Sequence, residues 1–380
     1  MLSGGLATSA EQLARKRPWE DNVQAIRSGA LTPVAPEGDA AIDREGLSNA
    51  VTTHENTLTT HDPAMLLAET RAFNAELERL LATMPSVHTV PPEQTRRLRR
   101  EGGGIFPVPV YLPQARTLDI DGPGGPISLR IIAPERESTG AFLHIHGGGW
   151  TLGSNDAQDP RLDRLARETG LTAVSVGYRL APENPYPAAP EDCEAAALWL
   201  LGDEGRTAIP NTGTLAIGGE SAGAHLSVLT LLRLRDRHGI TGAFGAALLE
   251  YGGFDLSMTP SQRLWGTRNL VLSEPILSWF GEQFVPMYSR EERRHPDISP
   301  LFAELSGMPP AIFTVGTQDA LLDDTLFMEA RWRAAGNSTE LHVWPEAPHG
   351  FISMPMAVAD AALDTEYEFL RRTLDLDVDN

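Results

Sequence analysis

The sequence contains very little cysteine and few basic residues relative to acidic ones. Cys193 is the single cysteine, so the chain cannot form an intramolecular disulfide, and a zinc site built from several thiolates is excluded. Only 31 lysine and arginine residues stand against 51 aspartate and glutamate residues, which gives a net charge of -20. This charge repels nucleic-acid phosphates and anionic membrane surfaces. We therefore expect no nucleic-acid partner and no stable membrane insertion.

Long apolar runs are also missing. No stretch of about 18 consecutive apolar residues occurs, which is the length that a membrane-spanning helix requires. Residues 1–21 lack the apolar stretch of roughly 7 or more residues that a secretory signal needs. We expect a soluble, cytoplasmic protein. The sequence is compatible with a homodimer and does not decide the oligomeric state.

The N-terminal part lacks the patterns of a folded core. Residues 1–60 are poor in apolar periodicity and rich in Gly, Pro, Thr, Asp and Glu, which is typical of a loosely packed extension. Asp62-Pro63 then opens a segment with leucines near helical spacing, which predicts an amphipathic helix over 61–84. The next segment carries Arg96, Arg97, Arg99 and Arg100 before Gly102-Gly103-Gly104. We interpret it as a solvated helix end and a hinge rather than an anion-binding site.

From Tyr111 onward, short apolar runs alternate with helical patterns, which predicts βαβ units on a parallel sheet. Five prolines interrupt this alternation over 255–305, so we expect an insertion over the carboxyl edge of the sheet. The prediction is an α/β fold with an eight-stranded, mostly parallel sheet flanked by helices. Strands are expected near 115–120, 127–133, 141–146, 172–177, 214–218, 245–250, 311–315 and 339–344. Helices are expected near 158–169, 188–202, 222–238, 276–284, 323–335 and 357–373. The predicted divisions are an N-terminal extension with cap helices (1–105), a catalytic core (106–254 and 301–380) and a cap insertion (255–300).

A glycine-flanked serine carries the sharpest chemical signal. Gly219-Glu220-Ser221-Ala222-Gly223 follows a short apolar strand and precedes a helical run. Such a turn forces the serine into a strained backbone conformation and points its hydroxyl out of the sheet edge at a positive helix end. The pentapeptide alone is also compatible with an ordinary glycine-rich turn. In its strand-to-helix context it predicts Ser221 as a nucleophile.

A second glycine motif supports this hypothesis. The strand over 141–146 runs into Gly147-Gly148-Gly149-Trp150, and successive glycines let the backbone approach a ligand with free amides. The amides of Gly148, Gly149 and Ala222 are therefore candidates for an oxyanion hole. Each such donor can lower a barrier by about 3 kcal/mol.

A serine hydroxyl needs a base, and that base needs a carboxylate to orient it. Asp319 follows the strand at 311–315, and His349 follows the strand at 339–344. The order Ser, Asp, His with each residue beyond a separate strand predicts a triad of Ser221, Asp319 and His349. Asp323 and Asp324 are alternatives for the acid; Asp319 is favoured because it comes first after the strand.

The remaining polar residues near these motifs have simpler interpretations. His144 and His146 alternate on one strand, but no third metal ligand stands nearby, so we expect structural hydrogen bonds there, with His146 holding the glycine loop. Glu220 is interpreted as structural. The predicted chemistry requires no metal and no organic cofactor.

Taken together, the motifs resemble the hormone-sensitive-lipase-like family of α/β-hydrolases, which includes bacterial carboxylesterases. The matching segments are 146–150, 178–183, 219–223, 319–324 and 349–351. The resemblance implies an α/β-hydrolase fold with a helical cap and a serine carboxylesterase that cleaves short- to medium-chain carboxylic esters through an acyl-enzyme. Trp150, Phe254 and Phe351 are candidates for the substrate pocket and are equally compatible with plain core positions.

The chain departs from the family pattern at two places. Ala320 stands where the family usually has proline, and Tyr251-Gly252 stands where it usually has Tyr-Pro. Neither position belongs to the reacting groups. Three alternatives remain open: cleavage of an amide, thioester or carbonate, acyl transfer that excludes water, and a binding protein without catalysis.

Overall fold

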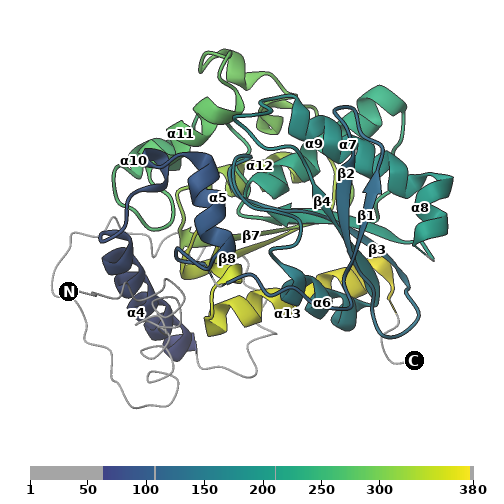
Figure 1. The fold of residues 1–380 in the computed structure, drawn as a ribbon, viewed down its shortest axis with the longest axis horizontal. Helices are drawn as coiled ribbons and strands as arrows, with labels where there is room; N and C mark the ends of the chain where they lie inside the picture. Colours follow the sequence, from purple (N-terminus) through teal and green to yellow (C-terminus); the bar gives the residue numbers. More distant parts are fainter. Residues whose placement is uncertain (1–62, 107, 210, 377–380) are drawn as a thin grey trace, which may run out of the picture.

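A twisted eight-stranded sheet forms the centre of the molecule (Figure 1). The computed structural model describes residues 63–106, 108–209 and 211–376. The strand order is β1-β2-β4-β3-β5-β6-β7-β8; β2 is antiparallel to both of its neighbours, and all other pairs are parallel. The strands are β1 (Arg116–Ile120), β2 (Ile127–Ile132), β3 (Gly140–Ile145), β4 (Leu171–Gly177), β5 (Leu215–Glu220), β6 (Ala246–Glu250), β7 (Ala311–Gln318) and β8 (Thr339–Pro348).

The central strands are buried on both sides. Every residue of β3, β5 and β6 is buried, whereas β2 alternates between buried and half-buried positions. Continuous apolar runs of this kind are typical of parallel strands that helices cover on both faces. The complete burial of β3, β5 and β6 agrees with their place in the middle of the sheet.

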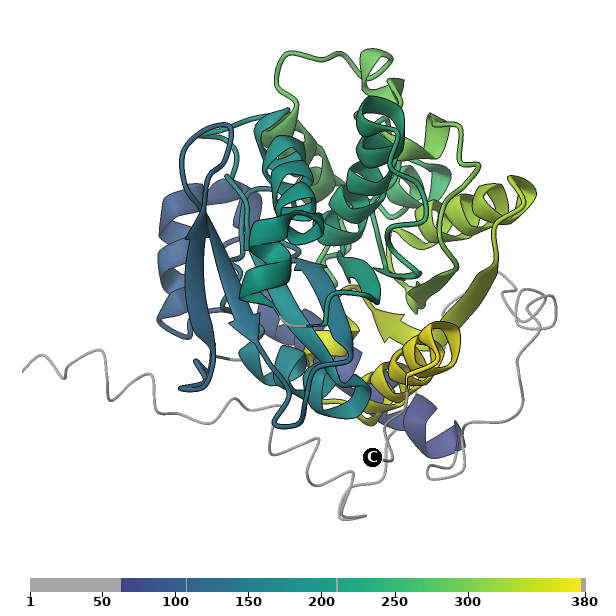
Figure 2. The same ribbon diagram turned by 90° about the vertical axis from the view of Figure 1, so that its right-hand side faces the viewer.

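Helices cover both faces of the sheet (Figure 2). On one face α6 packs against β4 and β2, and α13 packs against β6, β7 and α6. On the other face α9 packs against β5 and β6, α7 packs against α9, and α12 packs against β7 and β8. These helices are α6 (Asp159–Thr169), α7 (Ala188–Leu201), α9 (Ala222–His238), α12 (Leu322–Ala334) and α13 (Ala357–Leu374).

Two further groups of helices flank this core. The first precedes the sheet in the chain: α4 packs against β8 and α13, and the short η1 packs against α11 of the second group. In the second group α10 lies between α11 and α12. The first group is α4 (Pro63–Leu81), η1 (Val87–Thr89) and α5 (Pro92–Arg100), and the second is α10 (Pro260–Leu264) and α11 (Glu274–Phe284). The remaining short helices are α8 (Asp203–Ala208), η2 (Glu292–Arg294), η3 (Pro300–Phe302) and η4 (Phe351–Ser353).

The predicted eight-stranded, mostly parallel sheet is confirmed, and every predicted helix is present. The short α8 and α10 were not predicted, and β7 and β8 extend further than expected. The extension predicted over 1–60 lies outside the described residues. Among the helices described, none combines the length and the apolarity needed to cross a bilayer.

Candidate active site

Four loops that carry the predicted functional residues meet at one edge of the sheet. β3, β5, β7 and β8 run parallel to one another, so their carboxyl ends lie on the same side. The glycine loop follows β3, Ser221 follows β5, Asp319 follows β7, and His349 follows β8. Parallel topology alone thus gathers residues that are far apart in the chain.

Ser221 occupies the tight turn between β5 and α9. Its backbone has φ 57° and ψ -118°, a left-handed conformation that is costly for a residue with a side chain. The flanking glycines leave no room for a larger residue: a Cβ atom would lie 1.9 Å from the carbonyl oxygen of Ile145 at Gly219 and 1.8 Å from it at Gly223. The Ser221 N–H donates to the carbonyl of Glu250 on β6 at 2.9 Å. The turn is therefore held from both neighbouring strands.

A continuous chain of hydrogen bonds joins the three predicted residues. Nε2 of His349 lies 3.0 Å from Oγ of Ser221, and Nδ1 of His349 lies 2.8 Å from Oδ2 of Asp319. Asp319 is buried, and its other oxygen accepts a hydrogen bond from the Leu321 N–H at 2.8 Å. The imidazole is thus oriented by a fixed carboxylate, with its other nitrogen directed at the hydroxyl.

The two alternative acids lie elsewhere. Asp323 accepts a hydrogen bond from the Ser261 N–H at 2.7 Å. The carboxylate of Asp324 is fully buried and accepts from the Phe254 N–H at 2.8 Å and from the Thr259 hydroxyl at 2.7 Å. Both carboxylates anchor the beginning of the insertion to α12, and neither is hydrogen-bonded to His349 within the described chain.

An irregular strand end brings His349 to Asp319. The pairing of β7 and β8 shifts between Gly316 and Gln318, so β8 continues to Pro348 rather than ending at 344. A side chain at Gly316 would collide with the carbonyl of Ala347, because a Cβ atom there would lie 1.9 Å from that oxygen. The resulting bulge places His349 directly beyond the end of β7.

The glycine loop presents unpaired amides beside Ser221. Gly148 has φ 119°, and its carbonyl accepts from the Thr151 and Leu152 N–H groups, which closes the loop into a tight turn. Within the described residues, the N–H groups of Gly148, Gly149 and Ala222 donate no hydrogen bond. All three residues line the same cavity as Ser221 and His349.

A buried carboxylate holds this loop from behind. Oε1 of Glu220 accepts from the Gly147 N–H at 2.7 Å, and Oε2 of Glu220 lies 3.1 Å from Nε2 of His144. Burial alone would raise the pKa of Glu220, but His144, Arg161 and the Gly147 N–H lower it to about 2. Glu220 is therefore ionised, and its contacts with the glycine loop and His144 agree with the structural role predicted for it.

His146 holds the other side of the loop. Its Nδ1 lies 2.8 Å from the Gly147 carbonyl, its ring stacks on Tyr178 at 4.2 Å between centroids, and the Tyr178 hydroxyl donates to the His146 carbonyl. Burial lowers the pKa of His146 to about 4, so the ring is neutral near neutral pH. The structural role predicted for His146 is confirmed. No group of three or more His, Cys, Asp or Glu residues in the described ranges is arranged to hold a metal ion.

Arg161 on α6 neutralises two buried carboxylates below the active site. It forms an ion pair with Glu250, and its Nη1 lies 3.6 Å from Oε2 of Glu220. Glu250 is fully buried, and burial raises its pKa while Arg161 opposes that shift. Glu220 supports the glycine loop, and the carbonyl of Glu250 supports the turn at Ser221. By pairing with both carboxylates, the guanidinium of Arg161 stabilises the residues that hold the glycine loop and this turn in place.

Replacing Arg161 with methionine is expected to lower the free energy of unfolding by about 3–5 kcal/mol, because the substitution leaves two buried carboxylates without their cation. Urea unfolding followed by tryptophan fluorescence measures this change. Arg164→Met on the same helix is the control: Arg164 pairs with Asp360 and Asp364, which are both exposed, so its loss should cost about 1 kcal/mol or less. Equal losses in the two variants would contradict the assigned role of Arg161.

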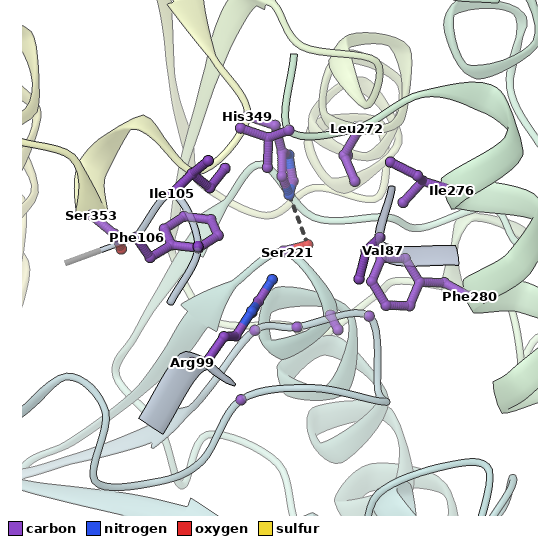
Figure 3. Close-up of a pocket in the computed structure, with 18 of the residues that line it drawn as sticks. Val87, Arg99, Ile105, Phe106, Ser221, Leu272, Ile276, Phe280, His349 and Ser353 are labelled. Atoms are coloured by element: carbon purple, nitrogen blue, oxygen red, sulfur yellow. Dashed lines mark hydrogen bonds between the residues drawn. The ribbon is translucent and has the colours of Figure 1, made fainter. Parts of the chain in front are cut away.

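A cavity of about 690 Å³ opens in front of Ser221 (Figure 3). Three residues of the insertion, Leu272, Ile276 and Phe280, form an apolar part of its wall, and Val87 of η1 lies beside Phe280. A Cβ atom at Gly149 would lie 2.2 Å from the Phe280 ring, so the glycine loop and α11 are in close contact. The walls thus come from a segment that precedes the sheet in the chain and from the insertion between β6 and β7.

Of the three apolar pocket candidates, only Trp150 lines this cavity. Its indole N–H donates to Nδ1 of His225 at 3.0 Å, so the ring is held in place. Phe254 and Phe351 are fully buried in the core and do not line the cavity. The pocket prediction was wrong for these two residues, because their loops turn them inward; Phe351 packs against Tyr251 at 5.9 Å between centroids.

The interpretation of the arginine cluster was also wrong in part. Pro92–Arg100 is a helix, α5, that lies against the cavity. Arg96 donates to the Thr151 carbonyl at 2.7 Å and pairs with Glu183 at 2.9 Å, which attaches the helix to the loop after the glycine motif. Arg99 lines the cavity, whereas Arg97 is exposed as expected. The sequence does not show which of these arginines faces the cavity, because all of them carry the same charge. Only the way in which the helix docks on the core distinguishes its cavity face from its exposed face.

Comparison with known proteins gives a consistent result. A family model described as alpha/beta hydrolase fold matches residues 142–353. The chain is 35% identical over 257 residues to the carboxylic ester hydrolase LipN of Mycobacterium tuberculosis, which covers 66% of this chain and 67% of that protein. It is 30% identical to an acetyl esterase of Salmonella choleraesuis, over 67% of this chain and 79% of that protein.

Solved structures are similar over most of the chain. A hyperthermophilic esterase from the archaeon Pyrobaculum calidifontis has a TM-score of 0.71 and 27% identity, and the match covers 79% of this chain and 97% of that one. A hormone-sensitive lipase from a metagenome library has a TM-score of 0.69 and 28% identity, with 83% of this chain and 99% of that one covered. The residues matched by the family model, 142–353, include all four loops of the sheet edge described above.

Proposed function

Because the chain belongs to the hormone-sensitive-lipase-like family of alpha/beta hydrolases and is a carboxylic ester hydrolase, we propose that it cleaves its substrates with Ser221 as the nucleophile, His349 as the base and Asp319 as the residue that orients the base. The observation that carries this proposal is the unbroken hydrogen-bond chain from Asp319 through His349 to Ser221 at the floor of a cavity.

The first half of the reaction forms an acyl-enzyme. Oγ of Ser221 attacks the ester carbonyl carbon while its proton moves to Nε2 of His349, and the carbonyl π electrons move to the oxygen. The amides of Gly148, Gly149 and Ala222 donate to this oxyanion, which costs no reorganisation because they have no other acceptor among the described residues. The tetrahedral intermediate then collapses, the bond to the alkoxy oxygen breaks, and His349 returns the proton to the leaving alcohol.

The second half repeats these steps with water. His349 takes a proton from water as the water oxygen bonds to the acyl carbon, which forms a second tetrahedral intermediate. The bond between the acyl carbon and Oγ of Ser221 then breaks, and His349 returns the proton to Oγ, which releases the carboxylic acid and restores the Ser221 hydroxyl. Asp319 keeps the proton on Nδ1 of His349, so that Nε2 can accept in each half-reaction.

The cavity suits small esters. We propose that η1, α5, α10 and α11 form the cap over the active site. The part of the cavity that receives the acyl chain is then bounded by these helices rather than by the sheet. A volume of about 690 Å³ is within the usual range of sites for small molecules, roughly 300–1,000 Å³. We propose that the cap favours short and medium acyl chains over long ones, as the family resemblance implies.

The proposal is tested with a series of para-nitrophenyl esters from acetate to palmitate. We expect kcat/KM to be highest for a short or medium chain and about tenfold or more lower for palmitate. Stoichiometric labelling by diethyl para-nitrophenyl phosphate, located by mass spectrometry on the peptide that contains Ser221, tests the nucleophile. Matched para-nitroanilides serve as the amide control. Faster cleavage of the anilides, or label on another residue, would contradict the proposal.

A further inference from the structure

One half-buried cationic side chain points into the cavity and has no anionic partner among the described residues. Arg99, near the end of α5, lines the cavity together with Ser221 and His349. Figure 3 shows its guanidinium directed toward the space in front of Ser221. The guanidinium carbon lies 5.1 Å from the centre of the Phe106 ring, so the cation stacks on an aromatic side chain.

Three of the other four arginines that line the cavity are already engaged, and the fourth, Arg100, is exposed to solvent. Arg96 pairs with Glu183, Arg161 pairs with Glu250, and Arg293 donates to the Tyr288 carbonyl. The carboxylates of the wall are engaged as well: Glu220 accepts from Gly147, and Asp255 accepts from the Ser257 N–H and hydroxyl. In the part of the chain that the structure describes, Arg99 forms no ion pair and its side chain donates no hydrogen bond.

Leaving this charge unpaired is costly. Arg99 is half-buried, and burial lowers its pKa to about 10, so it still carries its charge near neutral pH. No carboxylate among the residues that the structure describes opposes that shift. A desolvated cation without a partner costs free energy that an ion pair or a ligand would offset. The chain has 51 acidic residues and a net charge of -20, so a lack of acidic residues does not explain the missing partner.

We propose that Arg99 binds a carboxylate on the substrate, so that the preferred substrates are esters carrying a free carboxylate near the scissile bond. This inference rests on the proposed function of Ser221. In Figure 3, Leu272, Ile276 and Phe280 lie on one side of Ser221, and Arg99 and Phe106 lie on the other. An ester that spans Ser221 would place its apolar part against the first wall and its charged part at Arg99.

The chemistry of the guanidinium favours a carboxylate. Its planar fork matches the two oxygens of a carboxylate and donates two parallel, charge-assisted hydrogen bonds. The Phe106 ring next to it restricts the orientation of the guanidinium before the ligand arrives. A single unpaired guanidinium neutralises one negative charge, which is the charge of a carboxylate.

The test uses two matched pairs of esters, because the carboxylate can lie on the acyl or the alcohol part. In the first pair, mono-para-nitrophenyl adipate is compared with para-nitrophenyl adipamate. In the second, para-butanoyloxybenzoate is compared with para-butanoyloxybenzamide. Each pair differs only in carboxylate against carboxamide. The quantity measured is the ratio of kcat/KM for the carboxylate to that for the carboxamide.

We expect this ratio to be about ten or more in one of the pairs for the unsubstituted enzyme. Arg99→Gln should bring the ratio to about one or below, and Arg99→Lys should retain part of it, because the ammonium keeps the charge but not the fork. Arg97→Gln is the matched control: it removes one charge from the exposed side of the same helix and should leave the ratio unchanged.

A ratio near one in both pairs for the unsubstituted enzyme, or an unchanged ratio in Arg99→Gln, would overturn the inference. In either case the proposed function would still hold if the enzyme hydrolyses the carboxamide esters and the Ser221→Ala variant does not. If the enzyme hydrolyses none of the esters, the proposed function itself would be overturned. Should Arg99→Gln fail to fold, inhibition of the unsubstituted enzyme decides: adipate must inhibit butyrate ester hydrolysis more strongly than adipamide, or para-hydroxybenzoate more strongly than para-hydroxybenzamide.

Discussion

Replacing Ser221 with alanine is expected to reduce kcat for ester hydrolysis by about a millionfold while the protein remains folded. The variant lacks the oxygen that attacks the carbonyl, and the base at 3.0 Å has no proton to accept. Alanine fits the turn as well as serine does, because the crowding there involves Gly219 and Gly223 rather than the Ser221 side chain. Steady-state kinetics with para-nitrophenyl butyrate and the midpoint of thermal unfolding measure the two parts of the prediction.

Ser227→Ala provides the control on the same helix. The Ser227 hydroxyl is buried and donates to the Gly223 carbonyl at 2.8 Å, four residues earlier in α9. Its loss removes a buried hydrogen bond close to the site without removing a reacting atom, so activity should stay near that of the unsubstituted enzyme. Substantial turnover by Ser221→Ala would show that another group attacks the ester.

Asp319→Asn is expected to lower kcat by about ten-thousandfold. The amide can present an N–H to Nδ1 of His349, which then places the imidazole proton on Nε2 and prevents that nitrogen from accepting the Ser221 proton. The substrate contacts of the cavity stay in place, so KM should change far less than kcat. Labelling by diethyl para-nitrophenyl phosphate should slow to a similar extent, since it depends on the same proton transfer.

Asp323→Asn separates the assigned acid from its neighbour. Asp323 accepts from the Ser261 N–H and lies in the first turn of α12, so an asparagine oxygen can replace it as an acceptor. We expect its kcat to stay within about threefold of the unsubstituted value. A large loss in Asp323→Asn together with an active Asp319→Asn would transfer the role of the acid to residue 323.

The proposed reacting groups could be predicted from the sequence because local rules determine their positions. Ser221 lies between an apolar strand and a helix, and its flanking glycines are required by the close approach of the Ile145 carbonyl. Asp319 and His349 each follow a strand of the same parallel sheet, so topology brings them to the same edge. The strand positions alone therefore predict that the side chains of Asp319 and His349 lie close together.

The remainder depends on packing between distant segments. β8 continues to Pro348 only because it pairs a second time with Gln318 after a bulge, which apolar periodicity does not encode. Phenylalanine is common both in pockets and in cores, so the residue type of Phe254 and Phe351 does not distinguish the two locations. The direction in which their loops turn places both side chains in the core. Arg99 and Arg97 lie two positions apart, and only the docking of α5 distinguishes the cavity face from the solvent face.

The origin of the cavity walls has a consequence for how such an enzyme can diversify. Every atom assigned to bond breaking comes from loops at the sheet edge, whereas the surfaces that contact the rest of the substrate include η1, α5 and α11, none of which carries a residue assigned to bond breaking. Substitutions in those three helices can therefore alter which molecules are accepted without disturbing the reaction itself. The residues that determine substrate selectivity and those that determine turnover are therefore encoded in different segments of the sequence. Selection can act on one of these sets while the residues of the other stay unchanged.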